Sequence, residues 1–95
     1  MAAYVIADVE VLEAAGYEEY RQKVPATIAA AGGRYLARGG ATEKLEGNWL
    51  PKRCVILEFP STVRLKAWYD SPAYVPLRAI RERTTKSNLV MVEGL

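Results

Sequence analysis

The spacing of the apolar residues switches repeatedly along the chain, and this constrains the fold more than any other feature. Apolar and polar residues alternate in four segments, the period typical of strands: residues 4–11, 34–45, 53–59 and 88–93. Residues 14–31 and 61–86 instead repeat their apolar positions every three or four residues, as amphipathic helices do. The sequence therefore predicts strand, helix, strand, strand, helix, strand within a single domain, residues 1–95.

Glycine and proline refine these boundaries. Pro25 removes a backbone donor, which predicts a kink or restart in the first helix. Gly39-Gly40 predicts a bulge within the second strand, and residues 46–49 are typical of a hairpin turn. Ser61 is a candidate cap for the second helical region, which Pro76 is expected to interrupt until about residue 77.

This order is that of a ferredoxin-like α+β domain, in which a four-stranded antiparallel or mixed sheet carries its helices on one face. We expect the first and third strands to be central, parallel neighbours. The residues expected beneath the helices are Val5, Ala7, Val9, Val55, Leu57, Phe59, Val90 and Val92. The residues expected on the other face are Tyr4, Ile6, Cys54, Ile56, Leu89 and Met91. That second face is too apolar to leave in water, which predicts a homodimer packed sheet to sheet.

Composition argues against several classes of function. The net charge is +2 with acids and bases interleaved, so we expect neither a nucleic-acid nor a membrane partner, and the N-terminal residues favour a cytoplasmic protein. The chain has no histidine and one cysteine, which removes the usual haem ligand, zinc ligands and catalytic triads. We expect no cofactor and no metal.

Three charged residues stand among apolar ones on segments that should lie in one sheet: Asp8, Arg38 and Glu58. One interpretation is a small-molecule site in which Asp8 and Glu58 act as general acid or base and Arg38 binds an anionic group. If the two carboxylates are neighbours, one of them should have a raised pKa. The alternative interpretation is an ion network at the dimer interface.

A second group of candidate ligand-binding residues surrounds the break in the second helical region. It contains Trp68, Ser71 and Tyr74, and Tyr35 on the second strand resembles them. Aromatic residues at this spacing also commonly fill a core. Tyr74 follows a turn, so its hydroxyl is the one expected to reach a cleft.

Four segments together resemble a bacterial family catalogued as domain of unknown function 1330: residues 4–9, 32–40, 58–61 and 68–74. The resemblance implies a dimeric α+β barrel, a superfamily that includes cofactor-free monooxygenases, small isomerases and haem enzymes. The lack of histidine argues against the haem members. We therefore expect a homodimer that binds a small, partly apolar organic anion between sheet and helices, with catalysis of the isomerase or monooxygenase type left open. The alternative is a non-catalytic regulatory or protein-interaction module, in which the charged cluster serves the dimer interface.

Overall fold

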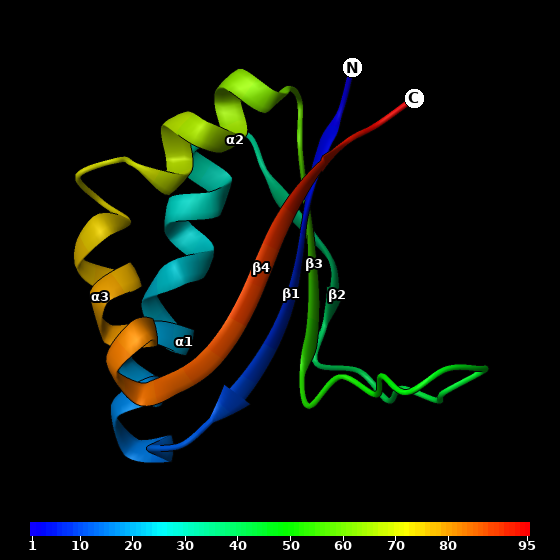
Figure 1. Ribbon diagram of the computed structural model, residues 1–95. Coiled ribbons are helices and arrows are strands. Elements are labelled where there is room, and N and C mark those ends of the chain that lie inside the picture. The colour runs from blue at the N-terminus through cyan, green and yellow to red at the C-terminus, as the bar shows by residue number, and fades with distance from the viewer.

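The computed structural model describes all residues, 1–95, and shows the ferredoxin-like α+β fold (Figure 1). The elements are β1 (Ala3–Val11), α1 (Ala14–Ala30), β2 (Arg34–Arg38), β3 (Cys54–Phe59), α2 (Thr62–Tyr69), α3 (Val75–Thr84) and β4 (Thr85–Glu93). The helices form one layer on one face of the sheet, and the other face carries no helix. None of the helices is long and apolar enough to cross a membrane.

The sheet is antiparallel throughout, in the order β2-β3-β1-β4. The prediction that the first and third strands run parallel was therefore wrong. The crossover through α1 makes β1 and β2 run in the same direction, and β3 returns between them, so β3 must oppose both. Asp8 consequently pairs with Cys54 at one end of β3, while Glu58 pairs with Tyr4 at the other end.

The hydrophobic core lies between the sheet and the helices. Alternate residues of β1 and β3 are buried there, as predicted: Val5, Ala7 and Val9, with Leu57 and Phe59. They meet the helical stripe formed by Tyr17, Tyr20, Val24 and Ile28 of α1. β1, β3 and α1 thus bury the face that their sequence period predicts.

The two faces of β4 are the reverse of the prediction. Leu89 pairs with Ala7 and Met91 with Val5, so both lie on the helix side of the sheet. Val90 and Val92 lie on the open face and are 60% and 45% exposed. Because both faces of this strand are apolar, alternation alone could not decide which was buried; the pairing with β1 decides it.

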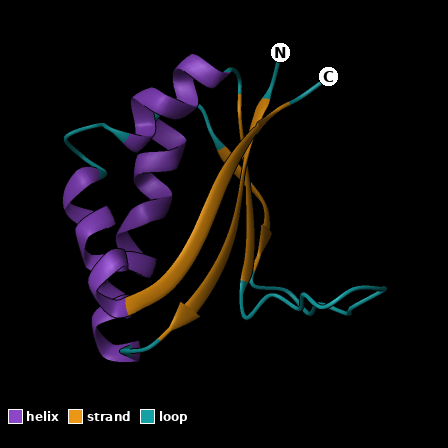
Figure 2. Cartoon of the chain, viewed as in Figure 1, coloured by secondary structure: helices purple, strands orange, loops and turns teal.

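The second strand is shorter than predicted, and a long projection follows it. Gly39, at φ 68°, ends β2 with a hydrogen bond from its N–H to Cys54 O of 2.8 Å. Residues 39–53 then form an arm without strand structure, directed away from the helix layer (Figure 2). Leu45, Trp49 and Leu50 are exposed on this arm.

The helix boundaries mostly follow the sequence signals. Ser61 caps α2 by accepting a hydrogen bond from the Arg64 N–H at 3.1 Å, as predicted. α3 begins at Val75, slightly earlier than expected, because Pro76 fits the first turn of a helix, where no acceptor awaits its missing N–H. α1 continues through Pro25 as one helix, without the predicted restart.

Candidate functional site

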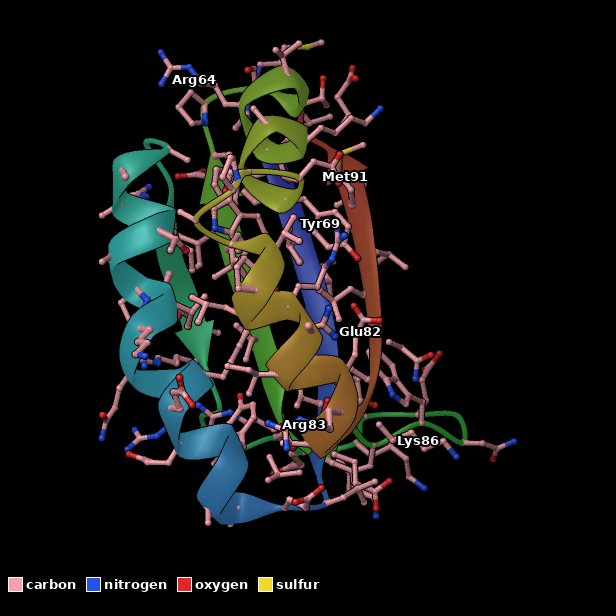
Figure 3. The ribbon with its side chains drawn as sticks, turned by 90° about the vertical axis from the view of Figure 1, so that its left-hand side faces the viewer. Arg64, Tyr69, Glu82, Arg83, Lys86 and Met91 are labelled. Carbon is pink, nitrogen blue, oxygen red and sulfur yellow. The ribbon has the colours of Figure 1, made fainter.

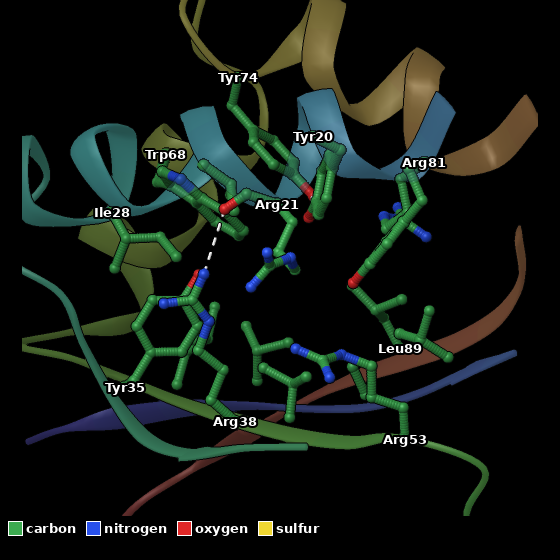
Figure 4. Close-up of a pocket in the computed structure, with 17 residues that line it drawn as sticks. Tyr20, Arg21, Ile28, Tyr35, Arg38, Arg53, Trp68, Tyr74, Arg81 and Leu89 are labelled. Atoms are coloured by element: carbon green, nitrogen blue, oxygen red, sulfur yellow. Dashed lines mark hydrogen bonds between the residues drawn. The ribbon is translucent and has the colours of Figure 1, made fainter. Parts of the chain in front are cut away.

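A narrow cleft lies between the sheet and the helix layer, with a cavity volume of about 40 Å³ (Figure 4). Seventeen residues line it, of which 13 are hydrophobic. The other four are Arg21, Arg38, Arg53 and Arg81. No acidic residue lines the cleft, and nowhere in the chain do three His, Cys, Asp or Glu side chains gather as metal ligands. The site is therefore apolar and strongly cationic.

Arg81 is the most buried of these arginines. It lies on the inner stripe of α3 with Leu77 and Thr84, and only 6% of it is exposed. Its Nε is buried and has no hydrogen-bond partner. Burial lowers the pKa of Arg81, but the neighbouring hydroxyls of Tyr74 and Tyr20 favour the charged form, so the pKa is raised overall. The structure thus holds a buried guanidinium without a counter-ion.

Arg53 provides a second unpaired group. It precedes β3 in phase with Val55 and Leu57, which places it on the helix side of the sheet. Its Nε is also buried without a hydrogen-bond partner. The guanidinium packs against Gly39, where any Cβ would collide with it. Glycine is therefore favoured at position 39 for two reasons: it adopts the left-handed backbone conformation without strain, and it leaves room for the Arg53 guanidinium.

Arg38 is held in the cleft by a hydrogen bond that the presence of Pro25 in α1 makes possible. In a regular helix the N–H of residue 25 would bond to the carbonyl of Arg21, but proline has no N–H. Arg38 Nη2 donates to that free carbonyl at 3.1 Å, the dashed line in Figure 4. Its Cζ also lies 4.6 Å from the centre of the Tyr35 ring, within the range of a cation–π contact.

We expect Pro25→Ala to stabilise the fold and to release Arg38. The new N–H at position 25 can bond to Arg21 O, so the free energy of unfolding should rise by up to about 3 kcal/mol. The Arg38 guanidinium should become more mobile, as seen in the ¹⁵N relaxation of its Nε–H, because the carbonyl that accepts from its Nη2 is taken. Pro76→Ala is the matched control, since a first-turn proline has no helical acceptor to lose. An unchanged Arg38 signal in Pro25→Ala would contradict this role for Pro25.

An aromatic wall faces the arginines. Trp68 and Tyr74, which are 2% and 0% exposed, have ring centres 4.0 Å apart at an interplanar angle of 30°. Trp68 Nε1 donates to Thr27 Oγ1 at 3.0 Å, and the hydroxyls of Tyr20 and Tyr74 are 2.8 Å apart. Burial is the main cause that raises the pKa of Tyr20, and burial likewise raises that of Tyr35. Both phenols therefore stay neutral and can donate a hydrogen bond.

Of the predicted ligand-binding residues, the structure brings Arg38, Tyr35, Trp68 and Tyr74 together along the cleft. Ser71 is not among the lining residues. Its Oγ donates to Trp68 O at 2.8 Å and accepts from the Tyr74 N–H at 3.1 Å. Ser71 thus stabilises the turn that places Tyr74 at the cleft.

The prediction of neighbouring carboxylates was wrong. Asp8 and Glu58 lie at opposite ends of the β1–β3 pair, on the open face, and neither lines the cleft. Glu58 accepts a hydrogen bond from Arg34 Nε at 2.7 Å, and this contact is the main reason that its pKa is lowered. Arg38 pairs opposite Val55, so it is not the counter-ion of Glu58. The register of β2, shifted by a bulge between Tyr35 and Ala37, turns Arg38 toward the helices.

Asp8 instead fastens the base of the arm to the sheet. Its carboxylate accepts from Trp49 Nε1 and from the Lys52 N–H, both at 2.9 Å. The Trp49 hydrogen bond is the largest cause that lowers the pKa of Asp8, against the opposing effect of burial. Because the folded pKa is below the unfolded one, this attachment should be complete above the unfolded pKa and lost as pH falls through the folded pKa.

We expect Asp8→Ala to loosen the arm without opening the cleft. The Trp49 indole N–H should exchange with solvent roughly tenfold faster, because it loses a charged acceptor. Glu10→Ala, on the same face of β1, is the control. Equal exchange rates of this indole proton in the two variants, measured by NMR, would show that Asp8 does not hold the arm.

Arg53 and Arg81 line the cleft but were not predicted from the sequence as site residues. Cations near the C-terminal end of a helix commonly interact with its exposed carbonyls, so Arg81 does not stand out there. Yet Arg81 is spaced four residues from Leu77 and three from Thr84, which places it on the buried stripe. Arg53 likewise alternates with Val55 and Leu57. The sequence signal that could have identified both residues is an arginine at the same spacing as the buried apolar residues of its element.

The chain matches the family described as Domain of unknown function (DUF1330) over residues 2–95, and it belongs to that family. Among curated proteins no sequence matches it.

Solved structures with the same fold differ widely in sequence. A protein of unknown function from Rhodopseudomonas palustris has a TM-score of 0.81 at 18% identity, over 99% of this chain and 82% of that one. A dimeric ferredoxin-like protein of unknown function from Jannaschia has a TM-score of 0.67 at 12% identity, over 99% and 100%. SnoaB, a cofactor-independent oxygenase from Streptomyces nogalater, has a TM-score of 0.64 at 11% identity, over 99% and 92%. At these identities the likeness shows a shared fold alone.

Proposed function

We propose that this protein binds a small, partly apolar organic anion in the cleft between sheet and helices. The observation that carries this proposal is the pair of buried arginine Nε groups, on Arg53 and Arg81, which have no partner in a cleft that no acidic residue lines. A buried cation without a counter-charge costs several kcal/mol in desolvation. A carboxylate or enolate ligand offsets that cost, and guanidinium groups bind such planar anions through paired hydrogen bonds.

The other residues that line the cleft favour a ligand with an apolar body behind its charged group. The predominantly hydrophobic lining of the cleft is typical of small-molecule sites. The hydroxyls of Tyr20 and Tyr74 lie among these walls and can orient a carbonyl or hydroxyl oxygen of the ligand. The ligand class is therefore an organic acid with one charged end.

The same lining limits the chemistry. Arginines and neutral tyrosines can stabilise negative charge, but no carboxylate or histidine faces the cleft to remove a proton. A reaction in this cleft would have to begin with a substrate that arrives already as an anion, which the arginines then stabilise. Binding is accordingly the proposal, and the fold shared with a cofactor-independent oxygenase makes oxygen uptake a useful second readout.

The test is a calorimetric comparison of benzoate with benzamide, benzyl alcohol and benzylamine. These compounds share a ring and differ in the charge of the attached group. We expect benzoate to bind about 10- to 100-fold more tightly than the neutral analogues, the range of a charge-assisted hydrogen bond, and benzylamine not to bind. Equal affinity for benzoate and benzamide would contradict the proposal. Oxygen uptake with benzoate present separates turnover from binding alone.

We also propose that two copies associate through the open face of the sheet. A row of apolar residues crosses that face in register: Ala37, Ile56, Ile6 and Val90. The arm projects on the same side, so it would extend along a second copy docked there. A contact of sheet on sheet buries this row, and the dimeric Jannaschia protein of the same fold supports the assignment.

A further inference from the structure

The cleft has one side that faces solvent. Of its 17 lining residues, only Arg21 of α1 and Arg38 of β2 are exposed, and the others are buried or half-buried. Figure 3 views the helix layer from outside and shows α1 over the β2 edge of the sheet, with α3 toward the β4 edge. The mouth of the cleft therefore lies between α1 and β2, at these two residues.

The side chain of Arg38 spans this mouth. Its Nη2 donates to Arg21 O at 3.1 Å, and no other side-chain hydrogen bond joins α1 to β2. The guanidinium of Arg21 does not form a second bridge, because Glu18 of the same helix binds it through hydrogen bonds of 2.9 and 2.6 Å. A single hydrogen bond thus holds the two sides of the mouth together.

The closed cleft has room for the charged end of a ligand but not for its body. Its volume is about 40 Å³. A buried water needs roughly 10–15 Å³, so this space corresponds to about three water-sized groups, which is the size of a carboxylate. An apolar cavity that holds a benzene ring has roughly 150 Å³. A ligand with a ring therefore requires the cleft to widen, and the exposed mouth is the side that can move without disrupting the core.

We propose that Arg38 determines the size of the ligand that the cleft accepts. Its guanidinium must leave Arg21 O before any body larger than the carboxylate can enter between α1 and β2. This deepens the proposed function and rests on it. Because Arg38 is exposed, its guanidinium can turn into water when the bridge breaks. Only the molecules with a broken bridge accept a ring, so the closed bridge lowers the apparent affinity for large anions and not for small ones.

The first experiment compares formate with benzoate in NMR titrations of the wild-type chain, observing arginine Nε–H groups. Formate is a carboxylate without a body, whereas benzoate adds a ring. We expect both anions to shift the signals of Arg53 and Arg81, whose Nε groups are buried without a partner. Only benzoate should make the Arg38 Nε–H more mobile in ¹⁵N relaxation, because only benzoate requires the bridge to break.

The second experiment repeats both titrations on Pro25→Ala, which changes a residue outside the lining of the cleft. Releasing Arg38 from Arg21 O should raise the affinity for benzoate by about 10-fold, the range of a hydrogen bond from a charged donor. The affinity for formate should stay unchanged. Pro76→Ala is the control, and neither affinity should change in it.

The outcomes separate this inference from the function on which it rests. If both anions shift Arg53 and Arg81 but Arg38 keeps the same mobility with benzoate as with formate, the anion site stands and the role of Arg38 is wrong. The same holds if Pro25→Ala changes both affinities equally or neither. If neither anion shifts Arg53 or Arg81, the proposed function itself is overturned, and the role of Arg38 with it.

Discussion

We expect Arg81→Met to be more stable than the wild-type chain and yet to lose most of its affinity for benzoate. Methionine has a similar length, so it can fill the space beside Leu77 without burying a charge. Removing a buried, unpartnered Nε should raise the free energy of unfolding by about 1–3 kcal/mol. For a domain of this size, each kcal/mol raises Tm by roughly 4–8 °C.

The loss of affinity follows from the same burial. Arg81 supplies a desolvated cation, so its removal should weaken benzoate binding about 10- to 100-fold. Arg83→Met is the matched control, because Arg83 is exposed on the same helix and lines no part of the cleft. Thermal unfolding and calorimetry on both variants measure the two effects. A destabilised Arg81→Met with unchanged benzoate affinity would mean that Arg81 is a structural residue.

A second large effect is expected on the open face, where Ile56→Glu should dissociate the proposed dimer. Ile56 lies at the middle of the apolar row, paired with Ile6 on one side and Ala37 on the other. A sheet-on-sheet contact would bury both new carboxylates in a dry interface without counter-ions, at a cost of several kcal/mol. The dissociation constant should therefore rise at least about 100-fold, measured by sedimentation equilibrium.

Val63→Glu provides the control for this change. Val63 is 75% exposed on α2, so the same kind of charge is introduced outside the sheet. We expect this variant to remain a dimer. If the wild-type chain sediments as a monomer at micromolar concentration, or if both glutamate variants associate equally, the open face is not the interface.

The fold was largely predictable because its signals are local. The alternation in β1, the helical stripe from Tyr17 to Ile28 and the Ser61 cap each specify one element, and together they leave few topologies. The predictions that were wrong concern the directions and facing of strands that pair over long distances in the sequence. The antiparallel pairing of β1 with β3 and the phase of β4 depend on how strands meet in space, and a one-residue slip exchanges their faces.

The candidate site could be predicted only in part, for the same reason. Tyr35, Trp68 and Tyr74 were identified because aromatic residues near a helix break or on a strand are conspicuous in sequence. Asp8 and Glu58 were grouped by an incorrect strand direction, and Arg38 was assigned to the wrong face because the bulge in β2 has no clear sequence signal. Pro25 and Arg38 are far apart in sequence, so their connection through the Arg21 carbonyl required the structure.

The most direct measurement of the central claim is the NMR detection of arginine Nε–H groups during a titration with benzoate. We predict that the signals of Arg53 and Arg81 shift together and become slower to exchange, because their unpartnered Nε groups acquire an acceptor. Exposed arginines such as Arg64 and Arg83 should not change. If only exposed arginines respond, or if Arg53 and Arg81 stay unchanged while benzoate binds, the cleft is not the anion site.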